Sequence, residues 1–120
     1  MNLKNITLNT AELGHVEWSS IKKLQPANEG FVFFVSYYVV TKNDISSEET
    51  DVLVANYIQT DFDHEPTYKE LINWIISKEY PNGKENQLLR QGIHNPEDAE
   101  YLDYYNNVEN IVAEVKSLLN

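Results

Sequence analysis

The densest group of side chains that could do chemistry is Asp61-Phe62-Asp63-His64-Glu65. Carboxylate and imidazole groups bind metal ions, and the same groups act as general acids and bases. A calcium loop needs further acids, a central glycine and a distant glutamate at fixed spacing, and none of these follows here. We therefore expect solvated charges in a connection between a strand and a helix, with no metal and no cofactor.

The remaining histidines and the serines do not indicate an enzyme. His15 and His94 are far apart in the sequence, and the chain has no cysteine that could complete a transition-metal site. No serine stands in a Gly-x-Ser-x-Gly motif, and the four glycines are scattered singly, unlike those of a phosphate-binding loop. We expect no catalytic residue. An enzyme that uses the cluster 61–65 is a third hypothesis, which a concave pocket around these side chains would favour.

The charge balance limits which partners the chain can attract. Nineteen acidic residues stand against nine lysine and arginine residues, and the formal net charge is −10. A field of this sign repels phosphate backbones and anionic lipids, so we expect no direct nucleic-acid binding and no membrane binding. The longest apolar run, at 31–40, is about half the roughly 20 residues that cross a bilayer. The absence of cysteine and of an apolar leader predicts a cytoplasmic location.

The N-terminal half has the pattern of an antiparallel sheet. Near Pro66 the apolar repeat changes from about 2 to about 3.6 residues, which indicates strands before this residue and helices after it. Residues 31–41 are apolar on both sides of a strand, which predicts a central strand with almost no solvent-facing side. A polar, acidic loop then joins it to a second strand at 52–60, as in a hairpin. Weaker alternation predicts strands at 3–8 and within 15–24.

The C-terminal half begins with a clear helix signal. Thr67 and Glu70 form a T-x-x-E capping box, which predicts a helix at 68–79. We expect an α+β fold in a single domain over residues 1–120, with the helices packed on the sheet. The side chains expected to be buried against the central strand are Leu71, Ile75, Val108 and Val112.

Two further helices are predicted from their ends. Residues 85–91 predict a short helix that Gly92 ends. Asn95 as the N-cap and Pro96 at the first helical position predict a last helix at 96–119. An apolar stripe along this helix predicts that one broad face is buried.

Acidic residues and tyrosines are the predicted partner-binding groups. The loop before the second strand carries Glu48, Glu49 and Asp51, and the last helix carries Tyr101 and Tyr104. Eight tyrosines exceed what a domain of this size needs in its core, and tyrosine is enriched at interfaces because it combines large contact area with a polar tip. The alternative is that most tyrosines are half-buried between sheet and helices.

The helical half resembles a family of small phage proteins. The segments 67–76, Tyr80-Pro81 and 97–105, which lead into an amphipathic last helix, are similar to small proteins of bacteriophages and prophages of gut Bacteroidales. Some of these proteins are placed near tail-assembly genes. The resemblance implies a non-enzymatic assembly or accessory protein in the bacterial cytoplasm, and it implies no catalytic residue.

Two hypotheses of function follow. The first is a non-enzymatic, acidic protein-interaction module with a protein partner, and a homo-oligomer is left open. The alternative is an acidic inhibitor, either an immunity protein or a DNA mimic, that presents carboxylates to a basic protein surface. A contiguous acidic stripe would favour the inhibitor, whereas scattered charge would favour the module.

Overall fold

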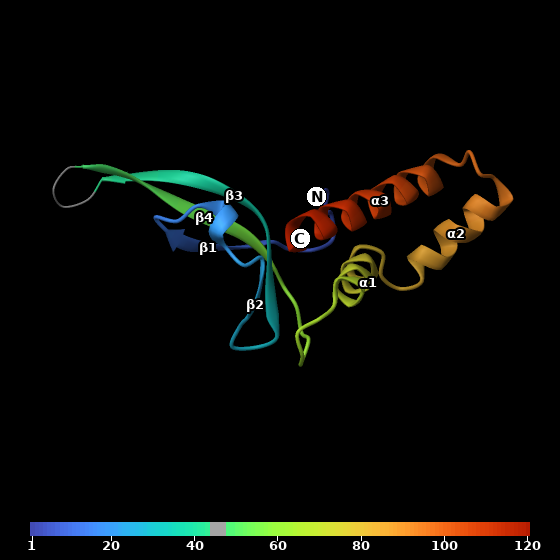
Figure 1. Cartoon of the computed structure of the whole chain (residues 1–120). Helices are drawn as coiled ribbons and strands as arrows, with labels where there is room; N and C mark the ends of the chain where they lie inside the picture. Colours follow the sequence, from blue (N-terminus) through green and yellow to red (C-terminus); the bar gives the residue numbers. More distant parts are fainter. Residues whose placement is uncertain (44–47) are drawn as a thin grey trace. The chain divides into compact units, whose positions relative to one another are not determined.

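The computed structural model describes residues 1–43 and 48–120, and within these residues the chain forms two compact units (Figure 1). The sheet unit comprises Leu8–Glu65, and the helix unit comprises Met1–Thr7 together with Pro66–Asn120. The boundary falls at the predicted change of apolar period. The α+β class is confirmed, whereas a single domain and the packing of the helices on the sheet stay predictions.

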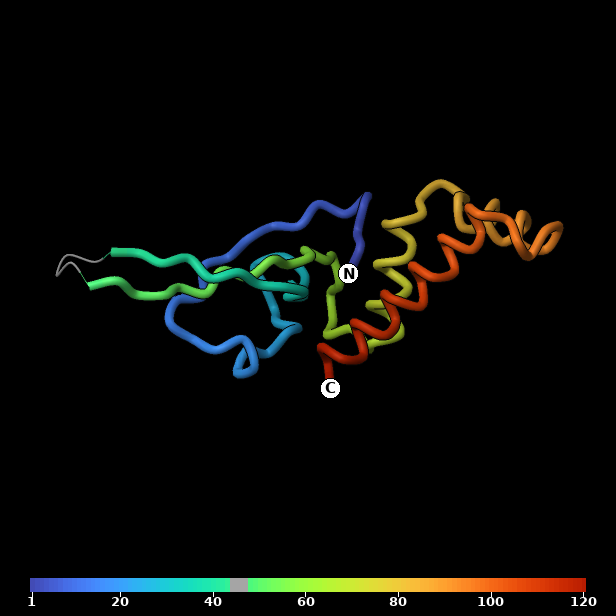
Figure 2. Tube along the Cα trace, turned by 90° about the horizontal axis from the view of Figure 1, so that it is seen from above, coloured from blue at the N-terminus to red at the C-terminus, as the bar shows by residue number. Residues whose placement is uncertain are grey.

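The described residues of the sheet unit form four antiparallel strands in the order β1-β4-β3-β2. The strands are β1 (Asn9–Gly14), β2 (Leu24–Pro26), β3 (Phe31–Asn43) and β4 (Glu49–Gln59). β3 and β4 pair along their lengths and run side by side in Figure 2, which confirms the predicted central strand and hairpin. Residues 44–47 of the predicted acidic loop lie outside the described residues.

The predicted N-terminal strands are wrong in position. Residues 3–8 form no strand, because the backbone of this segment binds the side chain of Glu79 instead. Within 15–24 only β2 at the end is a strand, and a short 3-10 turn, η1 (Trp18–Ser20), precedes it. β1 and β2 are the outer strands of the described sheet, so this connection must pass from one edge to the other instead of pairing within it.

The core of the sheet unit lies mainly along β4. The buried apolar residues are Leu24, Phe33, Phe34, Val52, Leu53, Val54, Ala55 and Ile58. β4 is buried on both faces, because four consecutive residues of it are buried. β3 is buried only at its start, and its predicted lack of a solvent-facing side is wrong from Ser36 onward.

Gly30 is required by the turn that joins β2 to β3. Its φ is +69°, in the left-handed region that side chains with a Cβ rarely adopt. A Cβ at this position would lie 2.1 Å from the carbonyl oxygen of Thr60. The turn is closed by the amide of Ala27, which donates to the carbonyl of Gly30 at 3.1 Å.

Within its described residues, the helix unit contains three α-helices. They are α1 (Tyr68–Glu79), α2 (Lys84–His94) and α3 (Ala99–Leu119). The predicted capping box at the start of α1 is present, since the amide of Glu70 donates to Thr67 Oγ1 and the amide of Thr67 donates to Glu70 Oε1. This local exchange of hydrogen bonds explains why the helix begins where the sequence predicts.

The predicted boundary between α2 and α3 needs correction. Asp98, and not Asn95, caps α3, because its carboxylate accepts a hydrogen bond from the amide of Tyr101 at 3.0 Å. Asn95 instead ends α2 and accepts a hydrogen bond from the amide of Glu97. Gly92 does not end α2 but lies inside it, where a Cβ would be 2.4 Å from the ring of Tyr101. Gly92 therefore allows a close approach of α3.

The apolar stripes of α1 and α3 supply the buried core of the helix unit. Leu71 and Ile75 of α1 are fully buried, as are two residues of α3, Ile111 and Val115. Val108 and Val112 are half-buried. The ring of Tyr104 lies edge-on to that of Tyr80, with 4.9 Å between the ring centres, and this pair extends the core toward α2.

A buried carboxylate joins residues 1–7 to the helices. Glu79 is 2% exposed, and its two oxygens accept hydrogen bonds from the amides of Lys4 at 2.6 Å and Asn5 at 3.2 Å. The side-chain amide of Asn5 also donates to the backbone carbonyl of Glu79 at 2.6 Å. These bonds explain why the N-terminal segment belongs to the helix unit.

Candidate protein-interaction surface

The part of β3 that follows Phe34 exposes large side chains. Tyr37, Tyr38 and Val39 are 48%, 47% and 53% exposed, although they are consecutive in a strand that pairs with β4. We call residues 36–43 of β3 and 49–56 of β4 the distal hairpin. An exposed apolar and aromatic patch on a strand is a typical mark of an interaction site.

A bulge at Val35 decides which faces of the sheet these side chains occupy. Phe34 is opposite Tyr57, but Ser36 is opposite Asn56, so Val35 is an extra residue in β3. Because paired residues share a face, the residues after the bulge fall into two sets. Tyr37, Val39 and Thr41 lie on what we call the first face, and Ser36, Tyr38 and Val40 lie on the second face.

The first face carries an aromatic pair that its surroundings hold in place. The ring of Trp18 stacks on that of Tyr37, with 5.0 Å between centres and 26° between planes. The ammonium group of Lys23 lies 4.1 Å from the centre of the Trp18 ring. It donates hydrogen bonds to the carbonyls of Trp18 and Ile21, and burial lowers the pKa of Lys23. The Trp18–Tyr37 pair is therefore held before any partner arrives.

Carboxylates lie on the same hairpin as the exposed tyrosines. Glu49 is opposite Asn43 on the first face, and Glu48 immediately precedes it in the chain. Asp51 is opposite Thr41 and accepts a hydrogen bond from its hydroxyl group at 2.8 Å. All three predicted acidic residues are exposed, and Asp51 is the one nearest to Val39 along the hairpin, because its partner Thr41 lies two residues after Val39.

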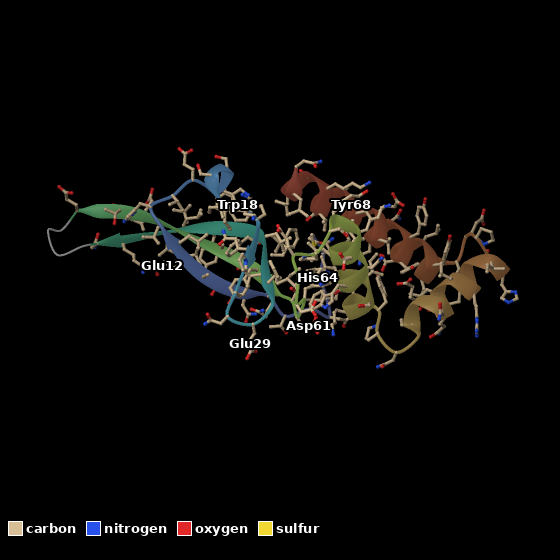
Figure 3. The ribbon with its side chains drawn as sticks, turned by 60° about the horizontal axis from the view of Figure 1, so that its bottom comes forward. Glu12, Trp18, Glu29, Asp61, His64 and Tyr68 are labelled. Atoms are coloured by element: carbon tan, nitrogen blue, oxygen red, sulfur yellow. The ribbon has the colours of Figure 1, made fainter. Side chains whose placement is uncertain are left out.

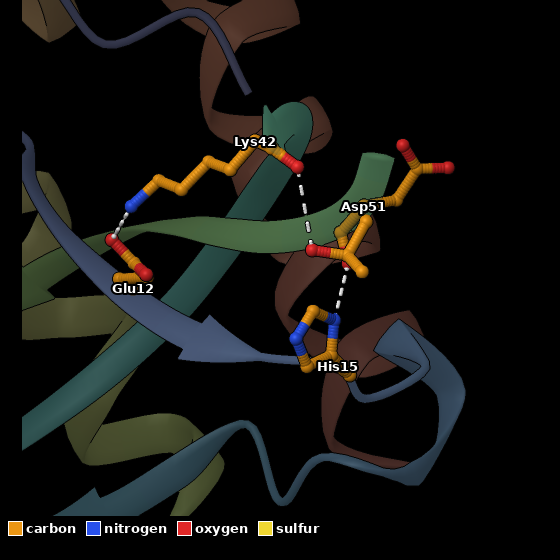
Figure 4. A network of polar contacts seen from close by, with 5 residues as sticks. Glu12, His15, Lys42 and Asp51 are labelled. Atoms are coloured by element: carbon orange, nitrogen blue, oxygen red, sulfur yellow. Dashed lines mark hydrogen bonds and ion pairs between the residues drawn. The ribbon is translucent and has the colours of Figure 1, made fainter. Parts of the chain in front are cut away.

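The lysine of this region is already paired. Lys42 is the only lysine or arginine between Lys23 and Lys69, and its ammonium group contacts a carboxylate oxygen of Glu12 at 2.7 Å (Figure 4). Figure 4 also shows His15, whose Nδ1 donates to the carbonyl of Asp51 at 2.7 Å. His15 follows the last residue of β1, and its hydrogen bond gives a partner to a backbone carbonyl of β4 that β1 does not reach. The pairing leaves a surface of negative net charge.

The predicted tyrosines of α3, Tyr101 and Tyr104, lie in the helix unit, whereas the predicted acids lie in the sheet unit. Tyr104 is 7% exposed, and burial raises its pKa to about 12, with a further contribution from the carboxylate of Glu85. Tyr101 is half-buried and packs at Gly92. The role of Tyr101 and Tyr104 in binding stays a prediction. The neighbouring Tyr105 is 50% exposed and therefore offers a partner more accessible surface than either of them.

The cluster at 61–65 lies in the connection that follows β4 (Figure 3). His64 Nδ1 is 2.7 Å from an oxygen of Asp63, and this hydrogen bond lowers the pKa of the Asp63 carboxyl group. Glu65 is 3.7 Å from the ammonium group of Lys22. In the part of the chain that the structure describes, no three histidine, aspartate or glutamate side chains are grouped to hold a metal ion.

The helix unit has a polar groove of about 700 Å³ along α2. It is lined mainly by amide side chains, together with Arg90, His94 and Asp98. The Oε1 atom of Gln91, one of the lining residues, is buried without a hydrogen-bond partner. The groove contains no serine, threonine or lysine that could act as a nucleophile. This lining can bind polar groups.

Comparisons with known proteins do not assign the chain to a family: no family model, no curated protein and no solved structure matches it. None of the helices in residues 1–43 and 48–120 has the length and apolar character needed to span a membrane.

Proposed function

We propose that the chain is a non-enzymatic protein-interaction module of the cytoplasm, and that its partner binds the distal hairpin. The observation that carries this proposal is the exposure of Tyr37, Tyr38 and Val39, each about half exposed on consecutive positions of one strand. Tyr37 and Val39 lie on the first face and Tyr38 on the second, so these side chains are exposed around the side of β3 that faces away from β4. Single exposed apolar residues are common on protein surfaces, but several large ones gathered along one side of a strand indicate an interface.

The surroundings of the patch support binding with little loss of conformational freedom. Tyr37 is held by the Trp18 ring, so its side chain has less rotamer entropy to lose when a partner covers it. Rigid aromatic side chains of this kind dominate the affinity of many interfaces. The carboxylates of Glu49 and Asp51 lie on the same face as Tyr37, opposite later residues of β3, and they favour a partner with a positive surface.

The alternative of an acidic inhibitor uses the same hairpin but a different source of affinity. In that case the carboxylates of Glu48, Glu49 and Asp51 would supply most of the binding, as in a mimic of a phosphate backbone. In the module, the aromatic residues supply the affinity and the carboxylates speed association. The resemblance of the helices to phage accessory proteins stays a prediction, and the proposal does not depend on it.

Site-specific photo-crosslinking tests the proposal. We would replace Tyr38 by benzoylphenylalanine, irradiate the protein in cells of its native host, and identify the crosslinked protein by mass spectrometry. Tyr105 on α3 is the matched control position, because it is a tyrosine of nearly the same exposed fraction in the other unit. We expect one defined partner from Tyr38 and not from Tyr105.

Purified components then distinguish the two sources of affinity. Tyr38→Ser should weaken binding of the identified partner by roughly tenfold or more, and Tyr105→Ser should leave it unchanged. Equal crosslinking from both positions, or full affinity of Tyr38→Ser, would show the proposal to be wrong. If neutralising Glu48, Glu49 and Asp51 weakens binding more than Tyr38→Ser does, the chain is an acidic inhibitor. Affinity should then fall steeply as salt shortens the screening length from about 10 Å to about 3 Å.

A further inference from the structure

The outer edge of β3, on the side away from β4, is covered by β2 only at its start. β2 pairs with residues 31–33 of β3. Just beyond this pairing, the amide of Phe34 donates a hydrogen bond to the carbonyl of Lys23 at 2.7 Å. Within the described residues, no strand pairs with the outer edge from Tyr37 to Asn43. A long stretch of one strand therefore has a neighbour on one side only.

The register shows which backbone groups point to this edge. The amide of Thr60 donates to the carbonyl of Phe31, so Thr60 directs its backbone groups toward β3. Along an antiparallel strand these directions alternate, so Asn56, Val54 and Val52 also direct theirs toward β3. Their partners are Ser36, Tyr38 and Val40, which therefore bond to β4. The residues between these partners must point outward, and they are Tyr37, Val39 and Thr41.

Other edges of the sheet have features that prevent pairing with another chain. β1 is short, is irregular between Glu12 and Gly14, and carries an exposed carboxylate at Glu12. Where β1 ends, the side chain of His15 donates a hydrogen bond to the carbonyl of Asp51, so this carbonyl already has a partner within the chain. Natural proteins commonly protect sheet edges by such charges, bulges and short strands. From Tyr37 to Thr41, β3 contains no charged residue, proline or glycine.

We propose that the outer edge of β3, at Tyr37, Val39 and Thr41, binds an extended segment of a protein partner by β-strand addition, and that this segment carries lysine or arginine residues. The inference rests on the proposed function and names its mode of binding. Main-chain hydrogen bonds to the three residues supply affinity, and alternate side chains of the added strand meet the two faces of the hairpin.

The side chains around the edge indicate the chemistry of the added strand. On the first face it meets Tyr37 and Val39, and on the second face it meets Tyr38. Neighbouring strands are about 4.8 Å apart, so the carboxylates of Glu49 and Asp51 on β4 lie about 10 Å from the added strand. This distance is close to the screening length at 0.1 M salt, so these charges favour a basic segment at physiological salt.

The same charges disfavour a second copy of this chain as the occupant. Pairing of two outer edges would bring together two chains that each carry a formal net charge of −10. A basic segment instead reduces the repulsion among the carboxylates of the hairpin.

A proline substitution tests the backbone contact separately from the side-chain contact. Val39→Pro removes the outward amide but no bond to β4, because Val39 is opposite Leu53 at a position whose backbone groups point away from β4. Val39→Ala is the matched control, since it shortens the side chain and keeps the amide. The probe is a capped ten-residue peptide that alternates valine with lysine, and NMR and fluorescence anisotropy follow its binding. A second peptide has glutamate in place of lysine.

We expect saturable binding of the lysine peptide, with amide shifts at Tyr37, Val39 and Thr41. Val39→Pro should weaken binding by roughly tenfold, because one backbone bond is lost and its acceptor is left without a partner. Val39→Ala should retain most of the affinity, and thermal unfolding of both variants checks that they fold. The glutamate peptide should bind more weakly than the lysine peptide.

Several results would overturn the inference. No binding of the lysine peptide, or equal affinity of Val39→Pro and Val39→Ala, would exclude β-strand addition at this edge. A dimer of the protein in sedimentation that Val39→Pro dissociates would show that a second copy is the occupant. Any of these results leaves the interaction module intact if Tyr38 still crosslinks to a partner, so the two proposals fail separately.

Discussion

Replacing Glu79 by alanine should release residues 1–7 from the helix unit. The carboxylate is 2% exposed and accepts the amides of Lys4 and Asn5 at 2.6 Å and 3.2 Å. A hydrogen bond to a charged group contributes about 1.5–3 kcal/mol, so the two bonds set an upper range of about 3–6 kcal/mol. Lys4 and Asn5 are exposed residues whose amides can return to water. We therefore expect a loss of about 2–4 kcal/mol in the free energy of opening this segment.

Hydrogen exchange measured by NMR reports this opening at the two amides concerned. In Glu79→Ala, the amides of Lys4 and Asn5 should exchange roughly 30-fold faster or more, because each 1.4 kcal/mol corresponds to a factor of ten. Glu79→Gln is the matched variant. It keeps one side-chain oxygen as an acceptor but presents an NH₂ group to the second amide, so its effect should be intermediate.

Urea unfolding of the same variants shows whether the loss is local or shared by the whole helix unit. The reasoning is wrong if Glu79→Ala leaves both exchange rates and the unfolding midpoint as in the wild type. It is also wrong if Glu79→Gln is the more damaging change, since glutamine retains one of the acceptors that alanine lacks.

Gly30→Ala should reduce stability by about 2–5 kcal/mol in urea unfolding, because the methyl group meets the carbonyl of Thr60 in a left-handed turn. Gly14→Ala is its control, since Gly14 has φ +80° but nothing within 4 Å of the added carbon, and a cost equal to that of Gly30→Ala would refute the clash. The folded pKa of Tyr104 is raised to about 12 from the ordinary value of 10.0, so its stabilising contribution is present below pH 10.0 and is lost as pH rises toward 12. Unfolding free energies across this pH window should fall by about 2–3 kcal/mol in the wild type and by less in Tyr104→Phe, and equal slopes would contradict this assignment.

Elements with local chemical signals could be predicted from the sequence. The start of α1 was predictable because Thr67 and Glu70 bond to each other's backbone, which needs no distant contact. The start of α3 was not predictable in the same way. Asn95 and Asp98 are both good capping residues, and the sequence alone does not show which of them caps the helix. The absence of a strand at 3–8 depends on Glu79, a partner about 75 positions away, and no local pattern reports it.

The candidate surface could be predicted only in part. The acids Glu48, Glu49 and Asp51 stood out as a charge cluster, and the structure places Glu49 and Asp51 on the distal hairpin and Glu48 immediately before it. The apolar pattern at 31–41 predicted a strand with almost no solvent-facing side, whereas the excess of tyrosines predicted that some of them bind a partner, and the sequence did not decide between the two for Tyr37 and Tyr38. The bulge at Val35 and the short extent of β2 expose them, and neither feature has a clear signature in one sequence.

The positions of the two tryptophans have a spectroscopic consequence. Trp18 lies in the sheet unit, stacked on Tyr37, and Trp74 lies in the helix unit. Each unit therefore carries one tryptophan, and in a variant with phenylalanine at either position the tryptophan emission, excited at a wavelength that tyrosine does not absorb, comes from one unit alone. If tryptophan emission is followed while each variant is heated, Trp18→Phe reports the melting of the helix unit and Trp74→Phe reports that of the sheet unit. Coincident curves would mean that both units unfold in one cooperative transition, and separate curves would mean that each unit melts independently.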